Sequence, residues 1–271
     1  MHTPAHTPDL SVPPLLEFRN VSVFNGGRQV LDSISFTVSE GEHLAILGPN
    51  GAGKSSLIKT ITREFYPVLD GRDVIFRVRG NAIWDVFAMR SGFGVVSNDL
   101  QQAFARDITG REVILSGFFS SVGLFNRDVT EAMDRRTDEI LAFLEIGHLC
   151  TKRMTEMSSG EARRFLIGRA LVHDPRTLIL DEPTNSLDLH ALHTFRQTLM
   201  KIAQSGKGII LVTHNLPDII PEISRVILMK DGRFTGDGKK ESLLTDGHIG
   251  NLFDVPVHVR KAGEYYYAME E

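Results

Sequence analysis

Two stretches near the start of the chain alternate apolar and polar residues with a period of two. Residues 15–24 and residues 30–38 both follow this pattern, and Asn25-Gly26-Gly27 separates them. Such alternation is typical of half-buried strands, and glycines between two such runs favour a tight turn. The pattern predicts an antiparallel hairpin, and the apolar run 74–76 predicts a further strand. We therefore expect an N-terminal antiparallel β-subdomain.

Three later runs are apolar without alternation, as in strands that are buried on both faces of a parallel sheet. They are residues 43–47, 177–181 and 208–214. A helix is expected after the first, over 56–61, and another after the second. The apolar positions of that second helix are Leu192, Phe195, Leu199 and Ile202, and Gly206 is its expected end. Strands that alternate with helices predict an α/β fold with a mostly parallel central sheet.

Residues 98–165 have a helical character that interrupts the strand pattern. Asp128-Val129-Thr130-Glu131 is a candidate capping box. Apolar residues then recur at helical spacing, at Met133, Ile140, Leu141, Phe143, Leu144 and Ile146. The pattern predicts a helical subdomain inserted into the α/β core.

Domain boundaries, charge, hydrophobicity and cysteine content add further expectations. We expect a flexible N-terminal arm over 1–14, one domain over 15–259 and a C-terminal tail over 260–271. The formal net charge of −4 does not indicate a basic surface, so we expect no direct binding to nucleic acid. No apolar run approaches the ~18 residues that cross a bilayer, so we expect no membrane span. Cys150 is the only cysteine, which excludes an intrachain disulfide and suits a reducing cytoplasm.

The stretch from Gly48 to Ser55 fits G-x-x-x-x-G-K-[ST], a phosphate-binding loop between a strand and a helix. Glycines let the backbone curl so that its N–H groups and the helix N-terminus face a polyphosphate. Lys54 would place a cation on the terminal phosphates, and Ser55 would offer its hydroxyl to Mg²⁺. The expected nucleotide contacts are Gly48, Pro49, Asn50, Gly51, Ala52, Gly53, Lys54, Ser55 and Ser56. A ligand-free glycine turn is the alternative that this strand–loop–helix setting disfavours.

Polar residues end two of the predicted central strands, at the sheet edge where ligands bind in such folds. Asp181 and Glu182 are adjacent, so their side chains point in different directions. We assign Asp181 to the metal and Glu182 to the general base that activates water. His214 is a candidate for contact with the γ-phosphate and the attacking water. Two solvated carboxylates and a structural histidine are the alternative interpretation.

Ser158 and Glu161 form a candidate capping box at the start of a helix over 162–171. The same helix start, with Ser158 and Gly160, presents a hydroxyl and free N–H groups that suit a second phosphate-binding surface.

These motifs together, in this order, resemble the nucleotide-binding subunits of ABC transporters, from about Leu15 to about Val259. Residues 48–55 resemble the Walker A motif, 178–182 the Walker B motif and 157–161 the signature. Ser186-Leu187-Asp188 is similar to the D-loop, and His214 to the switch histidine. The resemblance implies a P-loop NTPase core, and it adds Asp188 to the nucleotide contacts.

Several positions depart from the family pattern. The signature has Met157, Ser159 and Glu161 where the family usually has leucine, glycine and glutamine. Asn98 stands where the Q-loop glutamine is expected, and Gln101 is another candidate for its role. Phe24 falls where the family usually has a tyrosine that stacks on adenine, and phenylalanine keeps that stacking face.

The resemblance also implies a mechanism and partners. Two copies close head to tail around two ATP molecules with Mg²⁺, so that Ser158 and Gly160 serve the ATP of the opposite copy. Integral membrane permease subunits would hold the chain peripherally on the inner face of the cell membrane. The pattern over 236–257 resembles ATPases for import of iron chelates, vitamin B12 and molybdate, so a metal chelate or oxyanion is the expected cargo.

Two other functions compete with this interpretation. A soluble ABC ATPase that acts on a ribosomal or nucleic-acid partner would need no permease, and the altered Q-loop keeps this alternative open. A phosphotransferase would use the phosphate loop alone. Asp181, Glu182 and His214 together favour water as the phosphate acceptor.

Overall fold

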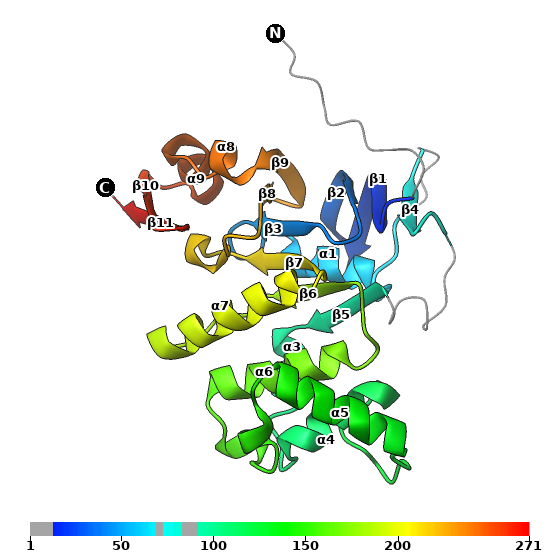
Figure 1. The fold of residues 1–271 in the computed structure, drawn as a ribbon. Helices are drawn as coiled ribbons and strands as arrows, with labels where there is room; N and C mark the ends of the chain where they lie inside the picture. The colour runs from blue at the N-terminus through cyan, green and yellow to red at the C-terminus, as the bar shows by residue number, and fades with distance from the viewer. Residues whose placement is uncertain (1–12, 69–72, 83–91, 271) are drawn as a thin grey trace.

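The computed structural model describes residues 13–68, 73–82 and 92–270. Within these ranges the chain forms a six-stranded sheet, a three-stranded sheet and a two-stranded sheet. Figure 1 shows the six-stranded sheet in the middle, the N-terminal sheet on one side and a group of helices beyond β5. Nearly all of the predicted arm, 1–14, lies outside the described residues.

The N-terminal sheet has the order β2-β1-β4, and both pairings are antiparallel. Phe18 of β1 stands opposite Phe36 of β2 and Phe76 of β4 in register. Its ring centroid lies 5.1 Å from that of Phe36 and 4.5 Å from that of Phe76, so three buried aromatic rings pack together across this sheet. The predicted hairpin is confirmed. The strands are Leu16–Asn25 (β1), Arg28–Val38 (β2) and Ile75–Val78 (β4).

The central sheet has the order β5-β6-β7-β3-β8-β9, parallel throughout except for the antiparallel β9. Its strands separate two hydrophobic cores: in β3, Ala45 and Leu47 face one, whereas Leu44 and Ile46 face the other. Burial on both faces explains the unbroken apolar runs of the sequence. The strands are Phe93–Val96 (β5), Thr177–Asp181 (β6), Gly208–Thr213 (β7), His43–Leu47 (β3), Arg225–Lys230 (β8) and Arg233–Lys239 (β9).

Helices cover the sheet and form the lobe that Figure 1 shows beyond β5. The lobe begins with α3 directly after β5, and α6 leads back into the sheet at β6. The amphipathic helix α7 then packs Phe195, Leu199 and Ile202 into the core, as its spacing predicts. The helices are Lys54–Ile61 (α1), Asn98–Ala103 (α3), Gly110–Ser116 (α4), Glu131–Phe143 (α5), Ser159–Leu171 (α6) and Leu189–Gln204 (α7).

Two capping boxes were predicted from the sequence, and one of them is wrong. Thr130, not Asp128, caps α5, and its hydroxyl accepts from the main-chain N–H of Met133. Ser158 caps α6 in a full capping box with Glu161, as predicted. Both Asp128 and Thr130 are good cap residues, so composition alone did not separate them.

The C-terminal region follows β9 with two short helices and a hairpin. Residues 260–271, expected to be a tail without a clear pattern, include β11 and the end of β10. Gly263, with φ +60°, closes the turn between these strands, and Tyr266 is buried. The elements are Lys240–Leu243 (α8), Asp246–Phe253 (α9), Val257–Ala262 (β10) and Tyr265–Glu270 (β11).

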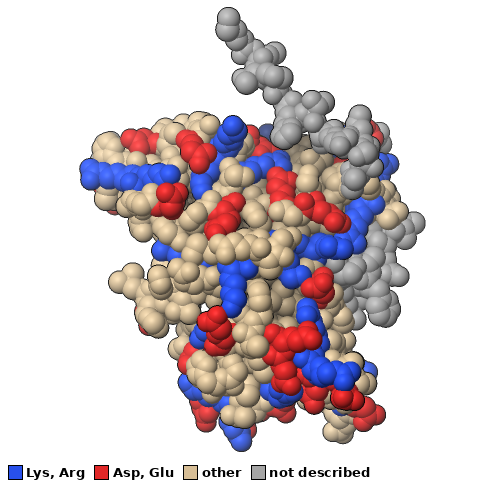
Figure 2. Space-filling view, viewed as in Figure 1, with Lys and Arg blue, Asp and Glu red and all other residues tan. Residues whose placement is uncertain are grey.

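Two surface properties bear on partners. Basic and acidic side chains are interspersed over the face in Figure 2, without an extended patch of one sign. Among the described residues, none of the helices combines the length and hydrophobicity needed to span a membrane.

Candidate functional site

The loop between β3 and α1 depends on glycine at three positions. A Cβ on Gly48 would lie 2.1 Å from the main-chain oxygen of Met229, so no other side chain fits there without backbone movement. Gly51 and Gly53 have φ of +81° and +102°, a region that other residues rarely adopt. Gly53 occupies the N-cap position of α1 without a capping side chain. The first N–H groups of α1 are therefore available to an anion.

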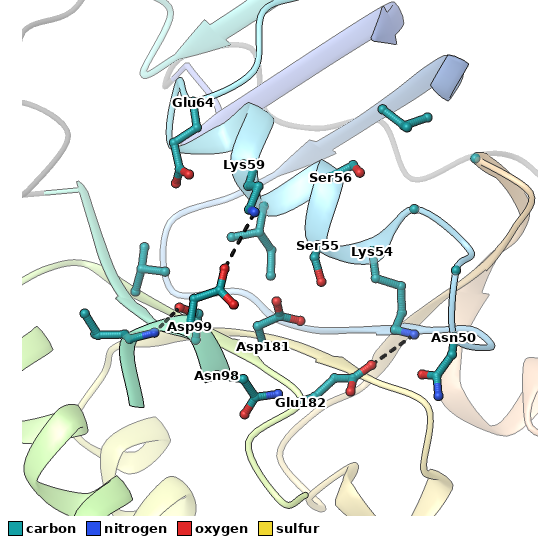
Figure 3. Close-up of a pocket in the computed structure, with 18 of the residues that line it drawn as sticks. Asn50, Lys54, Ser55, Ser56, Lys59, Glu64, Asn98, Asp99, Asp181 and Glu182 are labelled. Carbon is teal, nitrogen blue, oxygen red and sulfur yellow. Dashed lines mark hydrogen bonds and ion pairs between the residues drawn. The ribbon is translucent and has the colours of Figure 1, made fainter. Parts of the chain in front are cut away.

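This loop borders a cavity of about 810 Å³ (Figure 3). Five other segments contribute to its wall: the start of β2, α1 with the following Glu64, the β5–α3 region, the end of β6 and the β8–β9 turn. Of the predicted contacts, Asn50, Gly51, Gly53, Lys54, Ser55, Ser56, Asn98, Asp181 and Glu182 line the cavity.

The other predicted contacts do not line this cavity. They are Gly48, Pro49 and Ala52 of the loop, and Phe24, Gln101, Ser158, Gly160, Asp188 and His214 elsewhere. Phe24 is 51% exposed, and its cross-strand partner Gln29 does line the cavity.

Lys54 is buried and folded back over its own loop. Its Nζ donates to the main-chain oxygens of Gly48 at 2.8 Å and Pro49 at 2.9 Å. The same nitrogen lies 3.3 Å from Glu182 Oε1, and Figure 3 marks this ion pair with a dashed line. The cation is thus held at the cavity wall by groups that a phosphate can replace.

Glu182 follows β6 in a left-handed backbone conformation, with φ +47°. Its Oε1 lies 3.4 Å from His214 Nδ1 as well as near Lys54, and Asn185 Nδ2 donates to its Oε2 at 2.8 Å. Burial acts to raise the pKa of Glu182, but Asn185, Lys54 and His214 together hold this pKa below its ordinary value. The carboxylate therefore stays ionised at neutral pH, the form that a general base requires.

Asp181 has the opposite electrostatic setting. Burial raises the pKa of Asp181 and Glu182 adds to the increase, while the Ser55 hydroxyl and Lys54 oppose it. Its Oδ1 is buried without a hydrogen-bond partner among the described residues. The Ser55 hydroxyl points toward this carboxylate in Figure 3. An unpartnered carboxylate oxygen beside a hydroxyl is a donor set that fits Mg²⁺, which prefers oxygen ligands and retains several waters.

His214 sits in a loop that a buried carboxylate holds in place. Asp218 is 3% exposed, and its Oδ2 accepts from the Thr184 hydroxyl at 2.6 Å and from the Thr213 hydroxyl. Thr184, two residues after Glu182, and Thr213, directly before His214, are thereby joined through the Asp218 side chain. This network fixes the two candidate catalytic residues relative to each other.

Asn98 and Gln101 are brought together by a residue that the sequence analysis did not select. Arg163 of α6 donates from Nη2 to Asn98 Oδ1 at 3.0 Å and from Nε to Gln101 Oε1 at 3.0 Å. Asn98 lines the cavity and Gln101 does not. Both side chains that were candidates for the role of the Q-loop glutamine accept from this guanidinium through their amide oxygens.

The start of α6 contributes nothing to this chain's own cavity. Ser158 Oγ accepts from the main-chain N–H of Glu161, whose carboxylate also accepts from Lys152 Nζ at 3.0 Å. A Cβ on Gly160 would lie 2.8 Å from that of Ala191, so glycine there allows α6 to approach α7. Asp188 caps α7 by accepting from the N–H of Ala191 at 2.7 Å.

A sequence profile of the family described as "ABC transporter" matches residues 31–185, more than half of the chain. The chain belongs to the ABC transporter family. An uncharacterised ABC transporter ATP-binding protein, YlmA of Bacillus subtilis (strain 168), is 32% identical over 90% of this chain and 93% of its own. The Nod factor export ATP-binding protein I of Rhizobium etli is 33% identical over 85% of this chain and 70% of its own.

Solved structures agree on the ABC ATPase fold. A chain described as part of a metal-chelate type ABC transporter, in an inward-facing conformation, matches with a TM-score of 0.76 and 20% identity, over 95% of this chain and 98% of its own. A dimeric ATP-binding cassette bound to ADP and Pi matches with a TM-score of 0.66 and 24% identity, over 83% of this chain and 98% of its own. The predicted α/β architecture with a P-loop core is confirmed.

Within this ABC ATPase fold, two residues that touch the site, Asn185 and Arg163, were not predicted from the sequence. Asn185 lies in a tight turn between Glu182 and Ser186, both at positive φ, and local sequence does not reveal which side chain turns back. The position of Arg163 in the sequence could have indicated that its side chain is buried. It shares the spacing of Gly160, Ile167 and Leu171, all of them buried, so a charge stands on the apolar face of α6.

Proposed function

We propose that this ABC family member is an ATPase that splits ATP to ADP and phosphate and so powers a transporter. The observation that carries the proposal is the Glu182 carboxylate, which lies 3.3 Å from Lys54 Nζ and 3.4 Å from His214 Nδ1. A base, a cation for the terminal phosphates and a histidine thus meet at one end of an anion-binding loop. Asn185 holds the second carboxylate oxygen and so fixes the direction of the first.

Each side chain has a defined task in this proposal. The loop N–H groups and Lys54 hold the triphosphate, with Asn50 and Ser56 beside them on the cavity wall. Glu182 takes a proton from the attacking water, and His214 hydrogen-bonds to the γ-phosphate. Ser55 and Asp181 would hold Mg²⁺, which neutralises charge on the phosphate oxygens when it is bound. Phe24 would stack its exposed ring on adenine.

A second copy of the chain completes the site in this proposal. Ser158 and Gly160 are outside the lining of their own cavity, and in this proposal the N-terminus of α6 binds a phosphate of a facing copy. A head-to-tail homodimer would therefore enclose two ATP molecules, with Asp188 near the dimer interface. The dimeric state of one structurally similar ATP-binding cassette is compatible with this arrangement.

Coupling to transport requires integral membrane subunits, and we propose that these hold the chain on the inner face of the cell membrane. Import of a metal chelate or an oxyanion is the more specific form of the proposal. The pattern over 236–257 and the likeness to a metal-chelate type transporter support it, whereas the relative from Rhizobium etli is described as an export protein. Identification of the membrane subunit that co-purifies with the full chain tests this part.

Phosphate release from ATP, without any added acceptor, tests the hydrolysis. The Glu182→Gln variant removes the base but keeps the size of the side chain and most of its contacts. We expect kcat to fall by about a thousandfold, with ATP affinity within about threefold of the wild type. Glu241→Gln, an exposed change on α8, is the matched control and should hydrolyse ATP normally.

Two outcomes would overturn the proposal. Wild-type turnover in Glu182→Gln would remove this residue from the role of base. Phosphate transfer that depends on an added small molecule would instead favour a phosphotransferase.

A further inference from the structure

Arg163 is a buried cation that joins three separate segments around the cavity. It lies on α6, five residues after Ser158, and is 3% exposed. Its Nη2 and Nε donate to Asn98 Oδ1 and Gln101 Oε1, both at 3.0 Å, and Nη1 donates to the main-chain oxygen of Glu182 at 3.3 Å. One guanidinium therefore touches the β5–α3 segment, the candidate base and the helix of the signature.

All of these acceptors are neutral oxygens. Across the described parts of the chain, the hydrogen bonds of Arg163 go to two side-chain amides and one main-chain carbonyl, and none goes to a carboxylate. Burial lowers the pKa of Arg163 to about 10, against the influence of Asp218, so the side chain remains charged at neutral pH. Burying an arginine without a carboxylate partner is costly, and only a full set of hydrogen bonds offsets that cost. The three acceptors are therefore tied firmly to the guanidinium.

The planar geometry of the guanidinium group explains why arginine occupies this position. Its donors spread in one rigid plane, so displacement of one acceptor shifts the guanidinium relative to the others. Asn98 and Asp181 line the same cavity wall, and the Glu182 carbonyl belongs to the residue whose carboxylate faces Lys54. Residues 98–101 and the backbone of the candidate base are thereby joined through one side chain.

We propose that Arg163 is a positioning residue for ATP hydrolysis, which holds residues 98–101, Glu182 and the signature helix in one arrangement. The inference rests on the proposed function, because it assigns Glu182 to the base. It also gives Asn98 and Gln101 a defined role in this chain. They serve as the acceptors through which the β5–α3 segment acts on Glu182.

Kinetics of Arg163→Met in the full chain test the proposal. We expect kcat to fall by about tenfold or more, with KM and ATP affinity within about threefold of the wild type, because the phosphate loop is untouched. Arg163→Lys is the second variant. It keeps the charge and the burial but cannot reach all the acceptors, so it should fold where methionine does not and still lose several-fold in kcat. Arg135→Met, on the exposed face of α5, is the matched control.

A double-mutant cycle separates positioning from simple packing. The acceptors are removed together in Asn98→Ala/Gln101→Ala, alone and combined with Arg163→Met. Residues that act through one another give combined losses well below the product of the separate losses. We expect the acceptor substitutions to lower kcat less than about twofold further once Arg163 is absent. Losses that multiply would overturn the proposal, as would full kcat in a folded Arg163→Met or Arg163→Lys protein.

Failure of this inference is distinguishable from failure of the proposed function. A wild-type protein that releases no phosphate from ATP overturns both. A wild type that hydrolyses ATP through Glu182, with an Arg163→Met variant that hydrolyses it equally well, overturns only the role of Arg163.

Discussion

At the scale of single residues, the site is defined by how Glu182 is held. Its backbone is in the left-handed region, its Oε2 accepts from Asn185, and its Oε1 faces Lys54 and His214. These neighbours outweigh the effect of burial and keep the pKa of Glu182 low. Asp181, one residue earlier, has a raised pKa and an unpartnered oxygen. Two adjacent carboxylates thus suit different tasks, as a base and as a metal ligand.

Asn185→Ala tests the contribution of the amide to this environment. The change removes one influence that lowers the pKa of Glu182, so this pKa should rise. Activity needs the carboxylate and is lost as pH falls through its pKa, so the acid limb of the kcat profile should move to higher pH. We also expect kcat at neutral pH to fall by about tenfold, because the carboxylate is less well oriented.

The same substitution should also change how the stability of the protein depends on pH. A lowered folded pKa stabilises the protein above the unfolded pKa, and this contribution is lost as pH falls through the folded value. Asn185→Ala should therefore be less stable than the wild type at neutral pH, with a smaller difference in acid. Asn251→Ala, an exposed change on α9, is the control. An unchanged pH profile in Asn185→Ala would contradict the role given to this amide.

At the scale of elements, α5 and α6 offer a matched pair. Both have 13 residues, and the hydroxyl of a single N-cap residue, Thr130 or Ser158, accepts from the third N–H of each. The two caps should contribute similarly to stability, but only α6 is proposed to meet a nucleotide.

Ser158→Ala and Thr130→Ala separate capping from phosphate contact. Each should lower the free energy of unfolding by about 1 kcal/mol. Only Ser158→Ala should also lower the ATPase rate, by about fivefold, because it alone removes a hydroxyl from the proposed composite site. Thermal unfolding and phosphate release measure the two effects. Equal ATPase rates in the two variants would restrict Ser158 to capping.

Elements whose signal is local were predicted well from the sequence. The apolar runs gave β3, β6 and β7, and alternation gave the β1–β2 hairpin, because burial on two faces or one face dictates these patterns. The cap of α5 was misplaced because Asp128 and Thr130 are both good cap residues. The C-terminal hairpin was not predicted, because Glu264-Tyr265-Tyr266-Tyr267 lacks a clear alternation and its burial comes from distant elements.

At the scale of the whole molecule, the site exists only because distant segments converge. The phosphate loop was identified from a contiguous motif, whereas Arg163 meets Gln101 and Asn98 from 62 and 65 residues away. Sequence spacing cannot reveal such contacts. A charged residue on the apolar face of α6 indicates only that its side chain needs buried hydrogen-bond partners. Conversely, Ser158 and Gly160 lie outside the cavity that their motif is expected to serve. In the proposed dimer, each chain would therefore contribute to two nucleotide sites through different surfaces.

The mass of Glu182→Gln in solution, with and without ATP and Mg²⁺, tests this account most directly. Slow turnover should leave ATP bound, so size-exclusion chromatography with light scattering should give twice the monomer mass with ATP and the monomer mass without it. Addition of Ser158→Ala should weaken this dimer, and addition of Thr130→Ala should not. A protein that stays monomeric with ATP bound, while the wild type hydrolyses ATP at full rate as a monomer, would contradict the shared site.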